Sequence, residues 1–192
     1  MSVTAAAGFL AGGLAAGLKS NGRSDLALVV NSGPHDAAAA VFTSNRVKAA
    51  PVVWSEQALS DGRIRAVILN SGGANACTGP EGFADTHRTA ELVAEAVGVG
   101  AVDVAVCSTG LIGVRLPMDK LTAGIDHLAT QLSGDGGQAA AEAIMTTDSV
   151  PKQASYADEG WSVGGMAKGR RHVGTRPRDD ACRADHRCRS RS

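Results

Sequence analysis

The sequence contains few aromatic residues, few cysteines and no long apolar run. Aromatic residues make up only 3% of its 192 residues although 44% are hydrophobic, so a core must consist mainly of Ala, Val, Leu and Ile. The four cysteines include no CxxC pair, which favours a reduced, cytoplasmic protein over a disulfide framework. No apolar run reaches about 18 residues, so no membrane span is expected. Residues 1–17 are apolar without a basic start, and we interpret them as part of the fold rather than as a signal peptide.

A net charge of zero hides an uneven distribution of charge. Residues 170–192 hold eight of the 19 Lys and Arg residues but three of the 19 Asp and Glu residues. Residues 1–169 therefore carry 11 basic and 16 acidic residues, a net charge of −5. An acidic body of this kind lacks the basic footprint of a nucleic-acid-binding protein. The basic tail alone would favour a nucleic-acid arm, an alternative that rests wholly on residues 170–192.

Hydrophobic periodicity and turn residues predict an α/β protein. One helix is expected over residues 83–97 and a shorter one over 139–145. A third helix has Pro117 in its first turn and an apolar stripe at spacings of three and four, formed by Met118, Leu121, Ile125, Leu128 and Leu132. Helices that cover the faces of a sheet form an α/β sandwich. We expect the strands over residues 25–31, 37–43, 64–70, 102–107, 152–156 and 161–166.

Two of these strands run into glycine-rich turns, at residues 70–79 and 107–113. Such turns can direct backbone N–H groups at one point, which would suit an anion or the oxyanion of an acyl transfer. They are also compatible with tight turns that have no chemical role. A nucleotide phosphate is disfavoured because neither turn ends in Gly-Lys-Ser or Gly-Lys-Thr.

Five segments then occur in order with sensible spacing. They include Val-Cys-Ser-Thr-Gly-Leu-Ile-Gly at residues 106–113 and Ile-Met-Thr-Thr-Asp at 144–148, and the others are residues 42–52, 66–79 and 163–169. Together they resemble the bifunctional ornithine acetyltransferase / N-acetylglutamate synthase family of arginine biosynthesis. The resemblance covers residues 3–169 and implies the family's α/β sandwich of sheet and helix layers, incomplete in this chain.

The resemblance implies an acetyl transfer from N-acetylornithine to glutamate. Family members are made as one precursor that cleaves itself before a Thr. That Thr becomes the nucleophile and forms an acyl-enzyme, with its own α-amino group as base. No metal or bound cofactor is needed, although some members also accept acetyl-CoA as donor. The expected assembly is a heterotetramer of two alpha and two beta chains, without nucleic acid or membrane.

Four residues of this sequence match functional positions of the family. Thr109 and Gly110 match the pair that forms the oxyanion hole. Thr146 and Lys168 match positions that contact substrate, and Lys168 would suit a substrate carboxylate. Without the resemblance, Thr146 would equally suit a turn or capping residue, and Lys168 a solvated surface lysine.

The family's nucleophile is expected eleven residues after this lysine, within Ala-Thr-Met-Leu, where the sequence has Asp179 instead. The codons for residues 178–182, read one nucleotide later, allow Ala-Thr-Met-Leu with Thr in place of Asp179. The codons for residues 185–188 allow Thr-Thr-Asp-Ala, also typical of the family. We therefore predict a frameshift near the codon of Gly169, an alpha-chain portion at 1–169 and an out-of-frame, disordered tail at 170–192. Without the nucleophile, the chain is expected to be inactive. Without the second chain, which would bury apolar surface, it is also expected to be poorly soluble.

Other candidate residues lack good partners. Cys77 could act as a nucleophile with His87 as base, but a small buried thiol and a surface histidine are the simpler interpretation. His35 and His127 have no partners at metal-ligand spacing. A metal cluster of His172, His186, Cys182 and Cys188 is discounted because these residues lie in the out-of-frame tail. The alternative to an acyltransferase half is a non-catalytic fragment that only binds substrate-like amino acids or a partner chain.

Overall fold

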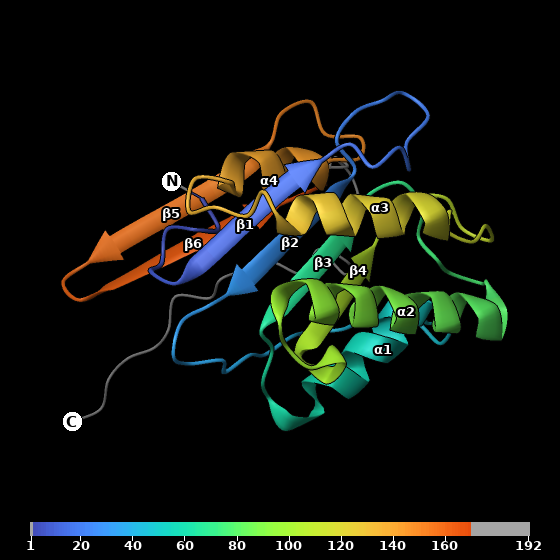
Figure 1. Cartoon of the computed structure of the whole chain (residues 1–192), viewed down its shortest axis with the longest axis horizontal. Coiled ribbons are helices and arrows are strands. Elements are labelled where there is room, and N and C mark those ends of the chain that lie inside the picture. Colours follow the sequence, from blue (N-terminus) through green and yellow to red (C-terminus); the bar gives the residue numbers. More distant parts are fainter. Residues whose placement is uncertain (1, 170–192) are drawn as a thin grey trace.

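The protein is described by a computed structural model over residues 2–169 (Figure 1). Within these residues, four strands form one sheet in the order β1-β2-β3-β4, and two further strands form a separate hairpin. The strands of the sheet are β1 (Phe9–Leu14), β2 (Leu26–Asn31), β3 (Ala66–Asn70) and β4 (Val104–Ser108). The hairpin consists of β5 (Lys152–Asp158) and β6 (Trp161–Ala167). The helices are α1 (Ala50–Ala58), α2 (Gly79–Val97), α3 (Met118–Ala129) and α4 (Gly137–Ala143), with 3₁₀ turns η1 (Leu59–Asp61) and η2 (Ala101–Asp103).

The sheet is mixed. β1 pairs antiparallel with β2, and β2 pairs antiparallel with β3. β3 and β4 are parallel, because the chain crosses through α2 between them. Asn70 is paired with Ser108 at the carboxyl ends of these two strands, so both glycine-rich turns leave the sheet at the same edge.

Helices α2 and α3 cover one face of the sheet (Figure 1). Alternate strand residues point to this face and form the main core with the apolar stripes of the two helices. The predicted stripe of α3 is confirmed: Leu121, Ile125 and Leu128 are buried, and Met118 and Leu132 pack at the border of the core.

Helix α4 covers the opposite face, where it packs on β1 and β2. Ala140 and Ala143 of the helix and Ile144, which follows it, form one apolar cluster with Ala27 and Val29 of β2. The approach to β1 requires a glycine, because a Cβ atom on Gly13 would lie 2.2 Å from the carbonyl oxygen of Ala139. The sheet is thus enclosed between helical layers, which confirms the predicted α/β sandwich.

Helix α1 lies along the outer edge of β4. The Trp54 indole donates a hydrogen bond to the Val104 carbonyl at 2.9 Å. The Ser55 hydroxyl donates to the Val106 carbonyl at 2.9 Å and accepts from the Val106 N–H at 3.0 Å. Side chains of a helix therefore satisfy the backbone groups that an edge strand would otherwise leave unpaired.

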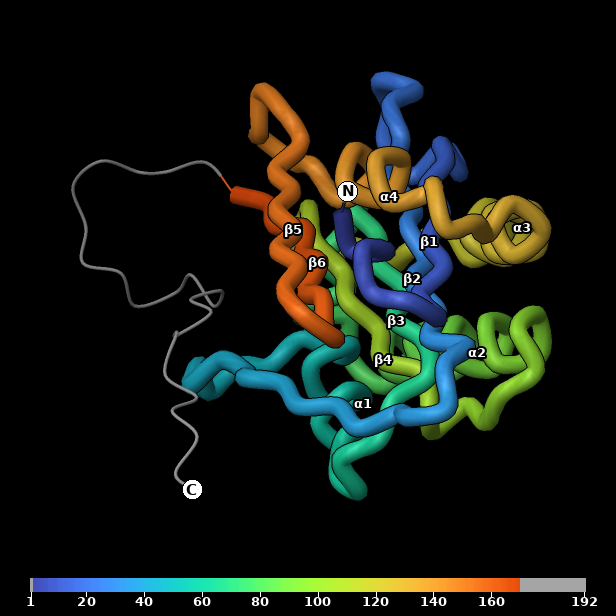
Figure 2. The backbone as a smooth tube through the Cα atoms, turned by 90° about the vertical axis from the view of Figure 1, so that its left-hand side faces the viewer, coloured from blue at the N-terminus to red at the C-terminus, as the bar shows by residue number. Residues whose placement is uncertain are grey.

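The β5–β6 hairpin stands beside the N-terminal segment (Figure 2). Met166 packs against the core beneath α4, and the Ser162 hydroxyl donates to the Ala5 carbonyl at 3.2 Å. Tyr156 and Trp161 remain exposed on the hairpin, with ring centroids 5.4 Å apart. Gln153 of β5 also hydrogen-bonds to Gln138 of α4, so both strands of the hairpin contact the rest of the fold.

Most predicted elements are confirmed, but the strand predicted over residues 37–43 is wrong. This segment makes only one isolated bridge, between Ala37 and Arg63, and most of it is exposed. Its apolar residues have no neighbouring strand to pair with, so its composition alone did not decide its conformation. Helix α1 and strand β1 were not predicted, although residues 9–14 lie in the sheet, as expected for an N-terminal region that belongs to the fold. The predicted tail, residues 170–192, lies outside the described residues.

Candidate functional site

The two glycine-rich turns at the ends of β3 and β4 pack against each other. The Thr109 N–H donates to the Asn70 carbonyl at 2.9 Å, and Gly73 and Thr109 form an antiparallel bridge. Two further backbone hydrogen bonds join the turns. The Ala74 N–H donates to the Leu111 carbonyl at 3.0 Å, and the Gly113 N–H donates to the Ala76 carbonyl at 2.8 Å. The turns thus form one double-layered loop structure at the carboxyl edge of the sheet.

Gly110 is required where the two turns meet. Its φ of +145° is a backbone conformation that residues with a side chain rarely adopt. A Cβ atom at this position would lie 2.7 Å from the backbone nitrogen of Gly73. Both conformation and close approach therefore restrict the position to glycine.

Thr109 and Gly110 are placed as neighbouring donors on an accessible surface. Thr109 is half-buried and Gly110 is exposed. The Thr109 backbone N–H is already bonded to Asn70, so Thr109 can offer only its hydroxyl to a ligand. Within residues 2–169, neither that hydroxyl nor the Gly110 N–H has a hydrogen-bond partner. An oxyanion bound here would be held by one side-chain O–H and one backbone N–H.

Asn75 holds the first turn against α2. Its side chain is fully buried, and its amide donates to the Gly82 carbonyl at 2.8 Å and to the Thr86 hydroxyl at 2.9 Å. Its amide oxygen accepts from the Thr78 hydroxyl at 2.7 Å. Asn75 also has a positive φ of 46°, which asparagine tolerates better than most residues. One side chain thus determines the shape of the loop from inside.

Arg115 holds the second turn against the same helix. Its guanidinium forms two hydrogen bonds with the buried Asp85 carboxylate, at 2.8 and 2.7 Å, and a third with Glu81 at 2.8 Å. The hydrogen bonds to Asp85 raise the pKa of Arg115 above its ordinary value. Both turns are therefore anchored to the first half of α2.

Thr146 and the residue after Lys168 are joined by the carboxylate of Asp148. The Asp148 side chain is only 1% exposed. It accepts from the Thr146 N–H at 3.2 Å and from the Gly169 N–H at 2.8 Å, and it pairs with the Lys152 ammonium. The structure therefore brings two predicted site positions, which lie 22 residues apart in the sequence, to one buried anion.

Lys168 lies near the end of β4 as well as near Asp148. It presents surface to solvent, but surrounding protein lowers the pKa of its ammonium group, while Asp148 and Cys107 act in the opposite direction. Cys107 is likewise exposed, yet desolvation by surrounding groups raises the pKa of its thiol, and the charge of Lys168 opposes this shift. Lys168 and Cys107 lie close enough for each to affect the pKa of the other, so the Lys168 segment lies near the strand that leads into Thr109.

An apolar pocket of about 360 Å³ opens beside this edge of the sheet. Residues 38–42, helix α1 and strand β4 surround it, and Cys107 and Ser108 form its polar end. Among the described residues that line it, none of the four predicted site residues occurs. The predicted site thus lies on the surface next to the pocket rather than within it.

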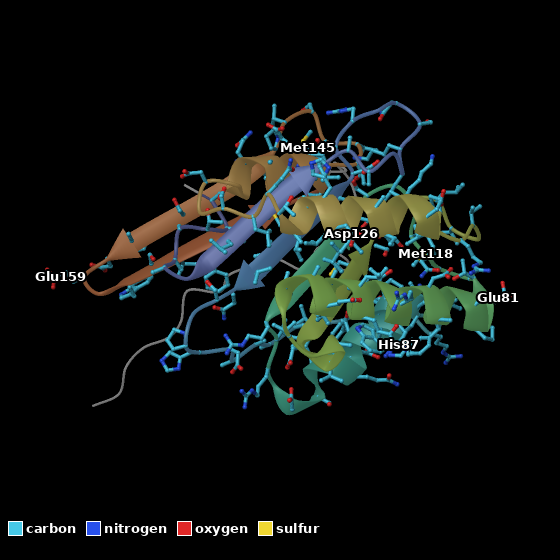
Figure 3. The ribbon with its side chains drawn as sticks, in the orientation of Figure 1. Glu81, His87, Met118, Asp126, Met145 and Glu159 are labelled. Carbon is cyan, nitrogen blue, oxygen red and sulfur yellow. The ribbon has the colours of Figure 1, made fainter. Side chains whose placement is uncertain are left out.

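The alternative candidates do not form a second site. Cys77 is exposed in the first turn, whereas His87 stacks on Trp54 with ring centroids 4.9 Å apart and approaches Glu91 at 3.8 Å. Figure 3 shows His87 on α2, away from its first turn at Glu81. No hydrogen bond joins Cys77 to His87 in the part of the chain that the structure describes.

Residues 2–169 contain neither a candidate metal site nor a helix that could span a membrane. No group of three or more His, Cys, Asp or Glu residues there could hold a metal ion. No described helix is both long and apolar enough to cross a membrane. His127 contacts Gln131 at 2.8 Å, and the tail residues Asp179, His172, His186, Cys182 and Cys188 lie outside the described residues.

Comparison with known proteins identifies the family. A protein-family model described as the ArgJ family matches residues 10–174. The chain belongs to the ArgJ family. The arginine biosynthesis bifunctional protein ArgJ of Streptomyces coelicolor is 66% identical over 169 residues, and its counterpart in Mycobacterium tuberculosis is 65% identical over 175 residues. The matches cover 88% and 87% of this chain but only 44% and 43% of those relatives, so the chain spans less than half of their length.

Solved structures of ArgJ-family proteins share this fold. The chain superimposes on ornithine acetyltransferase of Mycobacterium tuberculosis, crystallised with ornithine, with a TM-score of 0.87 at 62% identity. The match covers 90% of this chain and 94% of that one. The ArgJ structure of Bacillus halodurans gives a TM-score of 0.81 at 40% identity, covering 92% and 94%. The ornithine acetyltransferase fold predicted from the sequence motifs is thereby confirmed.

Three residues that organise the site were not assigned a role from the sequence. Asn75 and Asp148 lie within the family-like segments, and their short polar side chains next to apolar stretches were the available signal. Arg115 gave no signal, because its partner Asp85 lies 30 residues earlier on another element. These roles became visible only once the chain was folded.

Proposed function

We propose that residues 2–169 form the first half of an acetyltransferase that moves an acetyl group from N-acetylornithine to glutamate. Membership of the ArgJ family supports this role in arginine biosynthesis. The observation that carries the proposal is the pairing of the two glycine-rich turns, in which the Thr109 hydroxyl and the N–H of the next residue, Gly110, have no hydrogen-bond partner within residues 2–169.

In this proposal the two donors stabilise the oxyanion of acyl transfer. A threonine hydroxyl attacks the acetyl carbonyl of N-acetylornithine, and the carbonyl oxygen becomes negative in the tetrahedral intermediate. Ornithine leaves as the amine, and the amine of glutamate then takes the acetyl group from the threonine ester. Preorganised donors lower the barrier most where charge develops, and removal of one costs about 3–4 kcal/mol.

Thr146 and Lys168 are proposed to bind the substrate. The Lys168 ammonium would pair with the α-carboxylate that both N-acetylornithine and glutamate carry. Its position near Cys107, two residues before Thr109, supports a site in which carboxylate and acetyl group lie on opposite sides of one substrate. No cofactor is assigned, and acetyl-CoA as an alternative donor stays a prediction, as does a cytoplasmic location.

The nucleophile is proposed to be missing from this sequence. Asp179 stands at the position expected for the threonine, and the shifted reading frame of residues 178–182 allows Ala-Thr-Met-Leu. The family model matches residues 10–174, so most of the tail lies outside the match, which supports a change of frame before its end. We therefore propose that residues 170–192 are out of frame and that this chain neither cleaves itself nor transfers acetyl groups.

The relatives support a division into two chains. This chain covers 94% of the matched chain in the Mycobacterium tuberculosis crystal structure but 43% of the full-length ArgJ of that organism. These two fractions fit a protein whose first half is a separate chain. Assembly of two alpha and two beta chains remains part of the proposal.

The deciding experiment combines sequencing with an assay. The gene is sequenced across the codons for residues 163–192, and the chain is assayed for transfer from N-acetylornithine to glutamate before and after the frame is restored. Restoration should produce cleavage at the new threonine together with activity. Neither would appear if the chain is a non-catalytic fragment that only binds amino acids or a partner chain. Robust turnover by the unaltered chain would contradict the loss of the nucleophile.

A further inference from the structure

An ion pair between the buried Asp148 and the half-exposed Lys152 hydrogen-bonds to the backbone of Gly169, the residue after Lys168. The Asp148 carboxylate accepts the Gly169 N–H at 2.8 Å, and the Lys152 ammonium donates to the Gly169 carbonyl. Asp148 and Lys152 also pair directly with each other. We call this arrangement of Asp148, Lys152 and Gly169 the clip. Both polar groups of one residue are thus held by opposite charges.

The clip also reaches the Thr146 segment. The second carboxylate oxygen of Asp148 accepts the Thr146 N–H at 3.2 Å. Asp148 is therefore bonded to the backbone of one candidate substrate-binding residue and to the residue next to the other. A carboxylate that accepts several N–H bonds is fixed in orientation, and it holds its donors in a fixed relation.

The position of the clip separates it from the general core. Asp148 is buried, whereas half-exposed Lys152 closes the arrangement from the solvent side. Residues 146–150 have no regular secondary structure, and Gly169 lies beyond the end of β6. Lys152 begins β5 and pairs with Ala167, so the hairpin fixes one side of the clip, whereas residues 146–150 and Gly169 lie outside the strands. The clip therefore links the Thr146 segment to the end of the hairpin.

We propose that the Asp148–Lys152 clip is a positioning element of the candidate substrate site, which holds Thr146 and Lys168 in one arrangement. This inference rests on the proposed function for the roles of those two residues. Neither Asp148 nor Lys152 is assigned contact with substrate. They act through the backbone, so their loss misplaces the side chains that do make contact.

The test uses the full chain labelled with ¹⁵N and ¹³C, with the variants Asp148→Asn and Lys152→Met. Asp126→Asn is the matched control, because Asp126 is an exposed aspartate on α3. Three quantities are measured by NMR: amide exchange at Thr146 and Gly169, the pKa of Lys168, and the chemical-shift response to titrated ornithine. Lys152→Met keeps the test informative if Asp148→Asn folds poorly.

Loss of the clip should give a local signature. Asp148→Asn should speed amide exchange at Thr146 and Gly169 about tenfold, with β2 and β3 unchanged. The same change should lower the pKa of Lys168, since Asp148 now raises it, whereas Lys152→Met should not lower it. Ornithine binding should weaken about tenfold in Asp148→Asn and stay unchanged in Asp126→Asn.

Other results would overturn the inference. Unchanged exchange at Gly169 and an unchanged pKa of Lys168 in both variants would show that no clip operates. Faster exchange spread evenly over β2 and β3 would reduce Asp148 to a general stabilising residue. A chain that shows the local changes but ornithine binding equal to wild type would exclude a positioning role. If the wild-type chain does not respond to ornithine at all while the local changes occur, the clip stands and the proposed substrate role of Lys168 fails.

Discussion

At the scale of single residues, Gly110 is the position where the site tolerates least change. Gly110→Ala should destabilise the chain by about 1–3 kcal/mol, because alanine must adopt an unfavourable backbone conformation and its Cβ meets the backbone of Gly73. The free energy of unfolding from urea titration measures this cost. Gly134→Ala is the control, since a Cβ there has no neighbour within 4 Å. Equal stability of the two variants would contradict the packing of the two turns.

Asp148 gives the chain a specific dependence on acid. Burial tends to raise the pKa of its carboxyl, but hydrogen bonds from Lys152, Gly169 and Thr146 outweigh this and lower it to about 2. A carboxyl whose pKa is lowered by folding stabilises the protein above its ordinary pKa, about 3.9, and this contribution is lost as the pH falls toward 2. Wild type should therefore lose stability between about pH 4 and pH 2 more steeply than Asp148→Asn.

Urea titrations at several pH values measure the effect. The difference in unfolding free energy between wild type and Asp148→Asn should be constant above about pH 5 and shrink in acid. A difference that stays constant down to pH 2 would show that the carboxyl of Asp148 titrates normally.

At the scale of secondary structure, the contribution of the α1–β4 contact to stability can be measured with a single substitution. Ser55→Ala removes the partner of both the N–H and the carbonyl of Val106. Buried backbone groups left unpaired cost about 1–3 kcal/mol, so the variant should unfold at lower denaturant concentration. Ser60→Ala, at an exposed serine five residues further on in η1, should stay within about 0.5 kcal/mol of wild type.

The elements found and missed from the sequence show what local patterns can predict. Strands β2, β3 and β4 and helices α2 and α3 have strong periodicity, and their positions were predicted within a few residues. Strand β1 contains two glycines in six residues, and glycine has a low strand propensity, so its sequence does not indicate a strand. Gly13 is nevertheless required for the close contact with α4. The error at residues 37–43 is of the opposite kind, since apolar composition favoured a strand that has no partner.

The candidate site shows the same division. Thr109, Gly110, Thr146 and Lys168 were predicted because they lie in short segments with a recognisable pattern, and their roles stay predictions. The support around them could not be predicted, because it depends on contacts between distant parts of the chain. Arg115 meets Asp85 across 30 residues, and Asp148 meets Gly169 across 21.

At the scale of the whole molecule, apolar side chains beside the candidate site face solvent. Leu111 is 67% exposed and Ile112 63%, both within the second glycine-rich turn, and Val114, directly after the turn, is 55% exposed. Neighbouring exposed apolar residues favour association, so the chain should form larger species as its concentration rises. Light scattering measures this, and Ile112→Ser should reduce it.

Val102→Ser is the control, because Val102 is 65% exposed but lies apart from this turn. It should leave the association unchanged. If the chain remains monomeric at all accessible concentrations, or if both substitutions change its association equally, the second turn is not the surface through which it associates.

Because α1 covers the outer edge of β4, the two edges of the sheet differ in whether they can pair with an added strand. Trp54 and Ser55 already engage the outward groups of Val104 and Val106, so an added strand cannot dock there without displacing the helix. At the opposite edge, the outer side of β1 makes one isolated bridge with the rest of residues 2–169, between Ala11 and Ser133. A fused strand intended to extend this sheet should therefore be joined beside β1, and the same choice applies to any chain that completes the fold by strand addition.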